Sequence, residues 1–255
     1  MYAEERQQAI ASLVLQRGRA SVAELAEAYD VTTETVRRDL AALDRAGLLR
    51  RVHGGAVPVR ALHLVESGVG EREGTRADHK DRIAAAAADY FPAAGGSILL
   101  DAGTTTARIA AQVPTDRDLV VVTNSVPIAA RLAGVPSVRL QLLGGRVRGL
   151  TQATVGEQAL GVLDTLRVDV AFIGTNGISV SHGLSTPDSE EAAVKRAMVR
   201  AAGYVVVAAD SSKAGREDFV SFAPLSGVDT LITDKELGDN YRDQFTDRGV
   251  EVVVA

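Results

Sequence analysis

The first sixty residues place apolar side chains at the spacing of three short helices. Residues 4–16 predict the first helix, and Ser21-Val-Ala-Glu24 opens the second with a capping box, in which each end residue bonds the other's backbone N–H. Thr32 is suited to cap a third helix over residues 33–46, whose apolar side chains recur at i, i+4 and i+7. Because a tight turn separates the last two helices, the pattern predicts a helix-turn-helix.

The next stretch, residues 48–55, reads Leu-Leu-Arg-Arg-Val-His-Gly-Gly and is typical of a β-hairpin wing. In a winged helix-turn-helix the third helix enters the major groove of DNA, and basic side chains of the wing lie near the phosphates. The alternative is a small helical interaction module with an incidental arginine pair, which the capped third helix and the basic wing disfavour. The candidate DNA contacts are Ser21, Thr32, Thr33, Glu34, Thr35, Arg37, Arg38, Arg50, Arg51 and His53.

From residue 75 onward, helical segments alternate with short apolar runs, which predicts an α/β domain with a mainly parallel sheet. Five runs end in polar or glycine-rich residues, and in a parallel sheet such endings share one edge, where ligands bind. These endings are Asp101-Ala-Gly-Thr-Thr-Thr106, Thr123-Asn-Ser125, Gly144-Gly-Arg146, Gly174-Thr-Asn-Gly177 and Asp210-Ser-Ser-Lys213. Residues 146–156 and 182–187 are expected to be loops.

Residues 58–74 mix proline, glycine and charges without clear periodicity, which favours a linker, with a short strand as an option. We therefore expect a winged helix-turn-helix domain over residues 1–57, a linker over 58–74 and an α/β domain over 75–255.

Composition narrows the function classes. With 255 residues and 46% apolar residues, the chain can build two globular domains. No stretch approaches the ~20 apolar residues of a membrane span, so we expect a cytoplasmic protein without a membrane partner. The chain has no cysteine and only four histidines, without zinc-ligand spacing, so disulfides are excluded and no metal is expected.

The charge is distributed unevenly. The net charge is -5, yet residues 37–60 contain six Arg and two Asp. A basic strip on an acidic protein is typical of a surface that binds duplex DNA, although an ordinary solvated face is the alternative. Only four of the 28 cationic residues are lysines. This rarity suggests that a compact ammonium group matters at Lys80, Lys195 and Lys213.

The stretch 101–106 has the outline of a phosphate site. A strand that turns through a glycine onto a helix start presents backbone N–H groups and hydroxyls to one point, although a threonine-capped helix is the plainer interpretation. A phosphate suits this loop with a nearby cation, Lys213 or Arg146, whereas the Asp101 carboxylate and the Asn124 amide suit sugar hydroxyls. The candidate ligand-binding residues are Asp101, Gly103, Thr104, Thr105, Thr106, Asn124, Gly144, Gly145, Arg146, Asn176 and Lys213.

The segment Val31-Thr-Thr-Glu-Thr-Val-Arg-Arg-Asp-Leu-Ala-Ala-Leu43, followed by Arg51-Val-His-Gly-Gly-Ala56, resembles the signature of the DeoR family of bacterial sugar-metabolism repressors. The similarity continues through the strand endings and covers essentially the whole chain. It implies an N-terminal winged helix-turn-helix and a C-terminal sensor related to ribose-phosphate isomerase. It also implies a lysine near the ligand at Lys80, where an exposed helix lysine is equally compatible with the sequence, and an effector from a fructose or glycerol pathway.

An enzyme of the related isomerase type needs a carboxylate to move a proton, and the corresponding loop has Thr175 and Asn176 instead. We therefore expect a repressor without catalytic residues or a cofactor, released from operator DNA by a phosphorylated sugar. The alternatives are an isomerase-like enzyme that uses Asp101 or Glu157, and a constitutive DNA-binding protein. Since one winged domain covers little duplex, a homodimer or homotetramer is expected.

Overall fold

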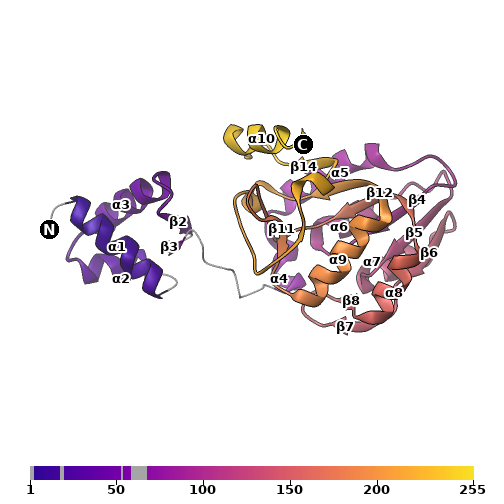
Figure 1. Ribbon diagram of the computed structural model, residues 1–255, viewed down its shortest axis with the longest axis horizontal. Coiled ribbons are helices and arrows are strands. Elements are labelled where there is room, and N and C mark those ends of the chain that lie inside the picture. Colours follow the sequence, from indigo (N-terminus) through magenta and orange to yellow (C-terminus); the bar gives the residue numbers. More distant parts are fainter. Residues whose placement is uncertain (1–2, 18–19, 53, 59–67) are drawn as a thin grey trace. The chain divides into compact units, whose positions relative to one another are not determined.

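The computed structural model describes residues 3–17, 20–52, 54–58 and 68–255. The chain forms two compact units, residues 1–62 and 63–255 (Figure 1).

The first unit contains the predicted helix-turn-helix and wing. Its elements are α1 (Ala3–Arg17), β1 (Ala20–Ser21), α2 (Val22–Ala28), α3 (Thr33–Arg45), β2 (Leu49–Val52) and β3 (Gly55–Pro58). The capping box between Ser21 and Glu24 is present, and the Thr32 hydroxyl accepts the N–H of Thr35 at the start of α3. The strands form an antiparallel sheet in the order β1-β3-β2.

Apolar side chains from all three helices make the core of this unit, among them Ile10, Leu25 and Leu40. One buried charge accompanies them: Asp39 on α3 accepts hydrogen bonds from Arg6 (2.6 Å) and Gln7 (3.0 Å) on α1. This buried pair ties the first helix to the third, because either partner alone would be an uncompensated charge or polar group.

The second unit is built on a seven-stranded sheet in which every strand pair is parallel. In spatial order the strands are β15 (Glu251–Val254), β14 (Thr230–Thr233), β12 (Ala202–Ala208), β9 (Val168–Ile173), β4 (Ser97–Leu100), β5 (Leu119–Thr123) and β6 (Val138–Leu142). This sheet confirms the predicted α/β class.

Helices cover both faces of the sheet, which explains why its strands are continuous apolar runs. Ile98 and Leu100 of β4 pack on one face, whereas Leu99 between them packs on the other. The first face is covered by α5 (Ala77–Ala87), α6 (Thr104–Ala110) and α7 (Val126–Leu132), and the second by α8 (Glu157–Thr165), α9 (Ser189–Ala201) and α10 (Asp239–Thr246). Among the described helices, none has the length and apolarity to cross a membrane.

Two stretches expected to be loops contain strands. In residues 146–156, β7 (Arg146–Arg148) and β8 (Ala153–Val155) pair as a hairpin. In residues 182–187, β11 (Gly183–Thr186) joins β10 (Gly177–Ser179) and β13 (Val220–Ala223) in an antiparallel sheet. These strands are too short for a readable alternation, and β11 is formed by pairing with a segment distant in the chain.

The expected linker also has structure of its own. Pro58 ends β3, residues 59–67 lie outside the described residues, and Val69–Gly74 form the short helix α4. A helix, not the optional strand, therefore occupies the part of this stretch that the structure describes next to the second unit. Six residues carry too little periodicity to predict a helix, and contacts with later segments hold α4 in place.

The order of strands changes direction between β4 and β9. From β4 the chain proceeds outward through β5 and β6, whereas β9, β12, β14 and β15 extend from the other side. In such sheets the loops after the two central strands diverge and leave a crevice at the carboxyl edge. Here those loops begin at Asp101 and Gly174.

Candidate functional site

A pocket lies in this crevice. It is lined by the loop after β4, by the loop after β9 and by the short 3-10 turn η2 (Ser211–Lys213) after β12. Side chains from three helices complete it: Arg72 from α4, Lys80 from α5 and Lys195 from α9. Three of the five predicted strand endings therefore line one pocket, which also includes helical residues that the strand pattern alone did not indicate.

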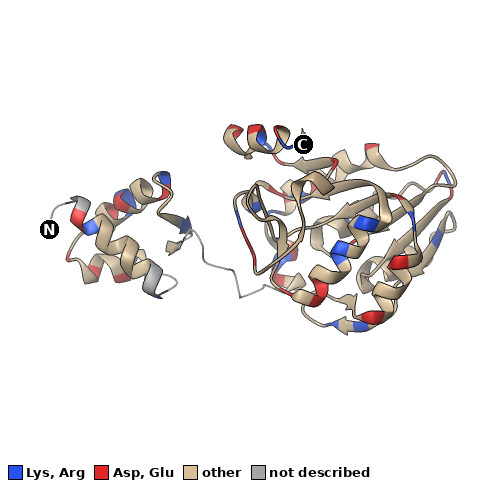
Figure 2. Cartoon of the chain, viewed as in Figure 1, with Lys and Arg blue, Asp and Glu red and all other residues tan. Residues whose placement is uncertain are grey.

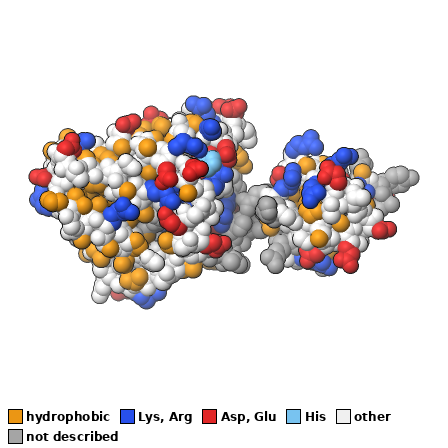
Figure 3. All heavy atoms as spheres, turned by 180° about the vertical axis from the view of Figure 1, so that it is seen from behind, with side chains coloured by type: hydrophobic (Ala, Val, Ile, Leu, Met, Phe, Trp, Pro, Cys, Tyr) orange, Lys and Arg blue, Asp and Glu red, His pale blue; other side chains and the backbone are white. Residues whose placement is uncertain are grey.

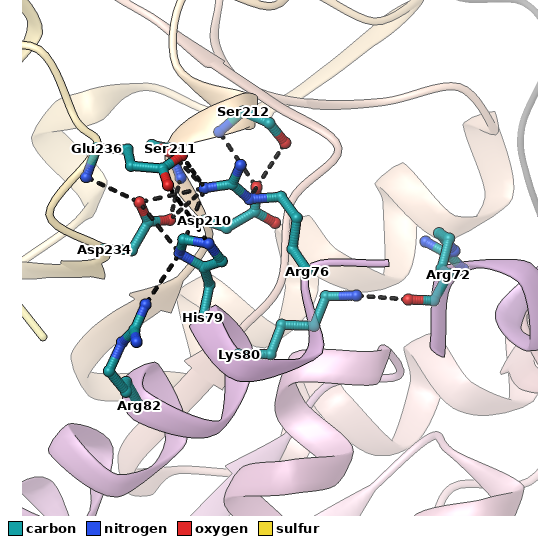
Figure 4. A network of polar contacts seen from close by, with 10 residues as sticks. All are labelled: Arg72, Arg76, His79, Lys80, Arg82, Asp210, Ser211, Ser212, Asp234 and Glu236. Atoms are coloured by element: carbon teal, nitrogen blue, oxygen red, sulfur yellow. Dashed lines mark hydrogen bonds and ion pairs between the residues drawn. The ribbon is translucent and has the colours of Figure 1, made fainter. Parts of the chain in front are cut away.

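Three cationic side chains of this pocket form no ion pair with any described residue: Arg72, Lys80 and Lys213. The Lys80 ammonium donates to the backbone carbonyl of Arg72 at 2.5 Å (Figure 4). The Nε of Arg72 is buried, and no described residue accepts a hydrogen bond from it. Cationic side chains thus outnumber the carboxylates that line the pocket, Glu191 and Asp210.

Burial and the neighbouring cations also lower the pKa values of two pocket lysines, Lys80 and Lys213. Burial lowers the pKa of Lys80 to about 8; Arg108 and Lys213 lower it as well, while Asp210 and Glu73 oppose them. Burial likewise lowers the pKa of Lys213; Arg216 and Arg72 lower it as well, while Asp210 and Asp218 act in the opposite direction. Both ammonium groups would be stabilised by an anion in the pocket.

The loop after β4 supplies donors beside these cations. No side chain caps the start of α6, and the N–H groups of Thr104, Thr105 and Thr106 have no acceptor among the described residues. The hydroxyl of Thr106 donates to the Gly103 carbonyl at 3.0 Å, which tightens the turn. Because α6 has only seven residues, its dipole contributes little. An anion would instead bind to the N–H groups at the start of α6 and to the nearby cations.

Asp101 occupies a different place from the one its sequence position suggested. Its buried carboxylate accepts from the Lys195 ammonium and from the Gly174 N–H (3.0 Å), and Lys195 also donates to the Gly174 carbonyl at 3.0 Å. Burial raises the pKa of Asp101, although Lys195 and Gly174 act in the opposite direction. Asp101 does not line the pocket but joins the ends of β4 and β9 to α9.

Four other predicted residues also lie outside the pocket lining. The Asn124 side chain accepts the Ala102 N–H at 2.9 Å and so supports the loop after β4. Gly144 and Gly145 lead into the β7–β8 hairpin, where a Cβ on Gly145 (φ +133°) would lie 2.5 Å from the Val155 carbonyl oxygen. Arg146 is 61% exposed and pairs with Glu190. Of the predicted ligand-binding residues, the pocket brings together Gly103, Thr104, Thr105, Thr106, Asn176 and Lys213.

Sequence reasoning missed several lining residues. Arg72 lies in the stretch that was expected to be a linker. Glu191 lies on α9, whose amphipathic pattern does not distinguish a pocket-lining carboxylate from a solvent-exposed one. The carboxylates of Glu191 and Asp210 are both engaged: Glu191 accepts from Thr151 and Arg148, and Asp210 from Ser212 and Arg76. The rarity of lysine pointed to both Lys80 and Lys195, and the family resemblance also pointed to Lys80.

Arg76 anchors the chain between α4 and α5 to the rim of the pocket. It adopts a left-handed backbone conformation (φ 55°), and its guanidinium pairs with Asp210 (3.1 Å), Asp234 (3.2 Å) and Glu236 (2.8 Å) (Figure 4). His79, Asp234 and Glu236 have spacing that a metal ion would accept. Because the Arg76 guanidinium already pairs with the carboxylates of Asp234 and Glu236, we interpret these carboxylates as an anchor for Arg76 and not as metal ligands.

Elsewhere the charges of the second unit are intermixed. In Figure 3, acidic and basic side chains lie side by side over the face shown, without a large region of one sign. On that face charges of opposite sign lie close together, whereas the pocket holds three cations that form no ion pair with a described residue.

Charged residues lie on all three helices of the first unit and on β2, and α3 and β2 carry the predicted DNA-contacting arginines (Figure 2). The side chains of Arg37 and Arg38 are 57% and 81% exposed, and each lies within 4 Å of Glu34 on the same helix. Thr33 and Arg51 are also exposed. The hydroxyls of Ser21 and Thr32 cap helices, Thr35 bonds Thr32, and the Arg50 side chain and His53 lie outside the described residues.

Comparison with known proteins identifies both units. Residues 6–60 match the DeoR-like helix-turn-helix domain, and residues 75–235 match the DeoR C-terminal sensor domain. The chain is 39% identical to the HTH-type transcriptional regulator GlpR of Haloferax volcanii, over 99% of this chain and 98% of that protein. It is 31% identical to the glycerol-3-phosphate regulon repressor of Escherichia coli K12, over 97% of each.

Among solved structures, ribose 5-phosphate isomerase A from Methanocaldococcus jannaschii aligns over 55% of each chain, with 18% identity and a TM-score of 0.41. The two domain matches lie in the same order as the two units and together extend over most of the sequence. The chain belongs to the DeoR family of DNA-binding transcriptional regulators.

Proposed function

We propose that this protein represses a sugar or polyol catabolic operon and that a phosphorylated sugar or polyol, bound in the pocket of the second unit, releases it from operator DNA. The observation that carries the proposal is a group of three cations, Arg72, Lys80 and Lys213, beside the N–H groups of Thr104–Thr106. Within the described ranges these cations form no ion pair and these N–H groups have no acceptor. Cations and backbone N–H groups of this kind bind phosphate oxygens.

The pocket supports binding better than catalysis. An isomerase needs a carboxylate that can take a proton from the substrate, and the two lining carboxylates, Glu191 and Asp210, already accept hydrogen bonds from neighbouring cations and hydroxyls. Asp101 is buried in its pair with Lys195. We therefore propose a sensor without enzymatic activity. Turnover of a sugar phosphate by the purified protein would contradict this.

The effector is proposed to be a phosphorylated metabolite of the size of glycerol 3-phosphate or a hexose phosphate, which agrees with the name of the glycerol-3-phosphate regulon repressor. A thermal-shift screen tests the class, since a ligand present at ~100 times its Kd stabilises a protein by about 2.7 kcal/mol. We expect phosphorylated compounds, and not their free sugars, to raise Tm.

The lysines provide a matched pair of variants for the location of the site. Lys213→Ala removes a cation of the pocket, whereas Lys235→Ala removes an exposed lysine. Calorimetry should show weakened binding of the sugar phosphate only in Lys213→Ala, while operator affinity without effector stays the same in both. Equal effector binding by the two variants would place the phosphate elsewhere.

A further inference from the structure

The helix α4 has an unusual position in the chain. It follows the winged helix-turn-helix unit and precedes every other described element of the second unit. It has six residues, none of them buried. A helix this short is unstable by itself, so its conformation depends on the contacts that other segments make with it.

Those contacts come from the elements that form the anion site. Lys80 of α5 donates to the carbonyl of Arg72 in the last turn of α4, and Arg108 of α6 pairs with Glu73 at 2.8 Å. At the other end, the Val69 N–H donates to the Leu150 carbonyl at 3.0 Å. The two helices that carry Lys80 and Thr104–Thr106 thus also hold α4.

Arg72 extends from α4 into the pocket. Its Nε is buried and has no hydrogen-bond partner in the part of the chain that the structure describes, and its charge is close enough to lower the pKa of Lys213. A buried donor without an acceptor is costly, and neighbouring cations add repulsion. An anion between Arg72, Lys213 and the loop after β4 would relieve both effects and attract α4 to the pocket.

The C-terminal end of α4 is fixed. Arg76 lies two residues after Gly74, and ion pairs with Asp210, Asp234 and Glu236 hold it. The N-terminal end is held more weakly, by the backbone hydrogen bond from Val69 to Leu150. We therefore expect a change in α4 to displace its N-terminal end, from which the chain leads to the first unit.

We propose that Arg72 binds the phosphate of the effector and that α4 is the element through which occupancy of the pocket acts on the DNA-binding unit. This inference rests on the proposed function and adds to it the route of regulation. A ligand shifts an equilibrium only through its different affinity for two states, and here the difference lies in whether Arg72 contacts the bound anion.

The test uses the full chain with Arg72→Gln, which removes the charge but keeps polar character, and Arg131→Gln, an exposed arginine of α7, as the matched control. The probes are inorganic phosphate, glycerol 3-phosphate and fructose 6-phosphate, and the operator is selected from random duplexes. We expect Arg72→Gln to weaken binding of the phosphate probes by roughly tenfold or more, the effect of losing one charge-assisted hydrogen bond, and Arg131→Gln to bind normally.

A fluorophore on α4 reports the second part of the proposal. The chain has no cysteine, and Gly70 is exposed with open space around its Cβ position, so Gly70→Cys gives a single label. The label should respond to the sugar phosphate that binds the otherwise wild-type chain. In the Arg72→Gln background we expect no response and blunted operator release even when the pocket is saturated.

The outcomes are distinguishable. A folded wild-type chain that binds no phosphorylated probe would overturn the proposed function. If the wild type binds and Arg72→Gln, with an unchanged Tm, binds equally well, Arg72 is not a ligand and this inference fails alone. Full operator release and a full fluorescence response by saturated Arg72→Gln would overturn the role of α4.

Discussion

Lys80 makes the pocket sensitive to pH, because burial lowers its pKa to about 8. Below that pH its ammonium is charged and can attract an anion. Above it the free protein has lost the proton, and binding must take one up from solution. We predict that affinity for a sugar phosphate falls as pH rises from about 7 to about 9, by up to about tenfold per unit above the pKa.

Calorimetry in two buffers of different ionisation enthalpy checks this, because proton uptake on binding changes the observed heat. Asp210, Glu73, Arg108 and Lys213 all act on Lys80, so the midpoint belongs to the cluster as a whole. Binding without proton uptake above pH 8 would show that Lys80 takes no part.

Asp101 is the residue for which the structure most changes the expected effect of a substitution. Asp101→Asn leaves the buried Lys195 ammonium without its carboxylate. We predict a loss of about 3–5 kcal/mol in the free energy of unfolding, as expected when one partner of a buried pair is removed. Urea denaturation measures it. Asp164→Asn, in an exposed pair with Arg200 at 3.7 Å, is the control and should cost no more than about 1 kcal/mol.

At the scale of elements, α3 is expected to make the main contacts with DNA. Arg37→Ala and Arg38→Ala should each weaken operator binding, by about 1–3 kcal/mol if the side chain contacts guanine. If it contacts a phosphate, the magnitude of the slope of the logarithm of the binding constant against the logarithm of the salt concentration should instead decrease by about one. Arg45→Ala, in the last turn of the same helix, is the control. Gel-shift titrations at several salt concentrations distinguish these cases, and normal binding by the Arg37/Arg38 double variant would exclude the assignment.

The elements with a strong local signal could be predicted from sequence. The helix-turn-helix follows from capping residues and periodic apolar positions, and the parallel strands follow from continuous apolar runs. The hairpin β7–β8 could not be predicted, because each of its strands has only three residues. The antiparallel sheet around β11 and the helix α4 could not be predicted either, because each is short and depends on partners distant in the chain.

The same limit applies to the site. Strand endings predicted that Gly103, Thr104–Thr106 and Lys213 share a pocket, since topology alone brings them to one edge. The local sequence does not show which partner a charged side chain meets. Asp101 pairs with Lys195 and Arg146 with Glu190, whereas Arg72 reaches the pocket from a segment without periodicity.

At the scale of the whole molecule, one winged helix-turn-helix unit contacts only a short stretch of duplex. We predict that the protein is a homodimer or homotetramer in solution and that its operator contains repeated half-sites separated by multiples of about 10 bp. Sedimentation equilibrium gives the oligomeric state, and footprinting gives the spacing. A monomer that protects a single half-site with full affinity would contradict the prediction.

The strand order of the sheet also determines when each unit can fold during synthesis. In the first unit, β1 pairs with β3 within the first sixty residues. In the second unit, β4 pairs with β9, so Leu99 cannot reach its partner until Ala171 has been synthesised. Local pairings form quickly and distant ones slowly, and during synthesis the N-terminal part emerges first. We therefore expect the DNA-binding unit to be complete while the ribosome is still synthesising the sensor domain. A chain truncated within the sheet would keep the DNA-binding unit but lack the domain that responds to the effector.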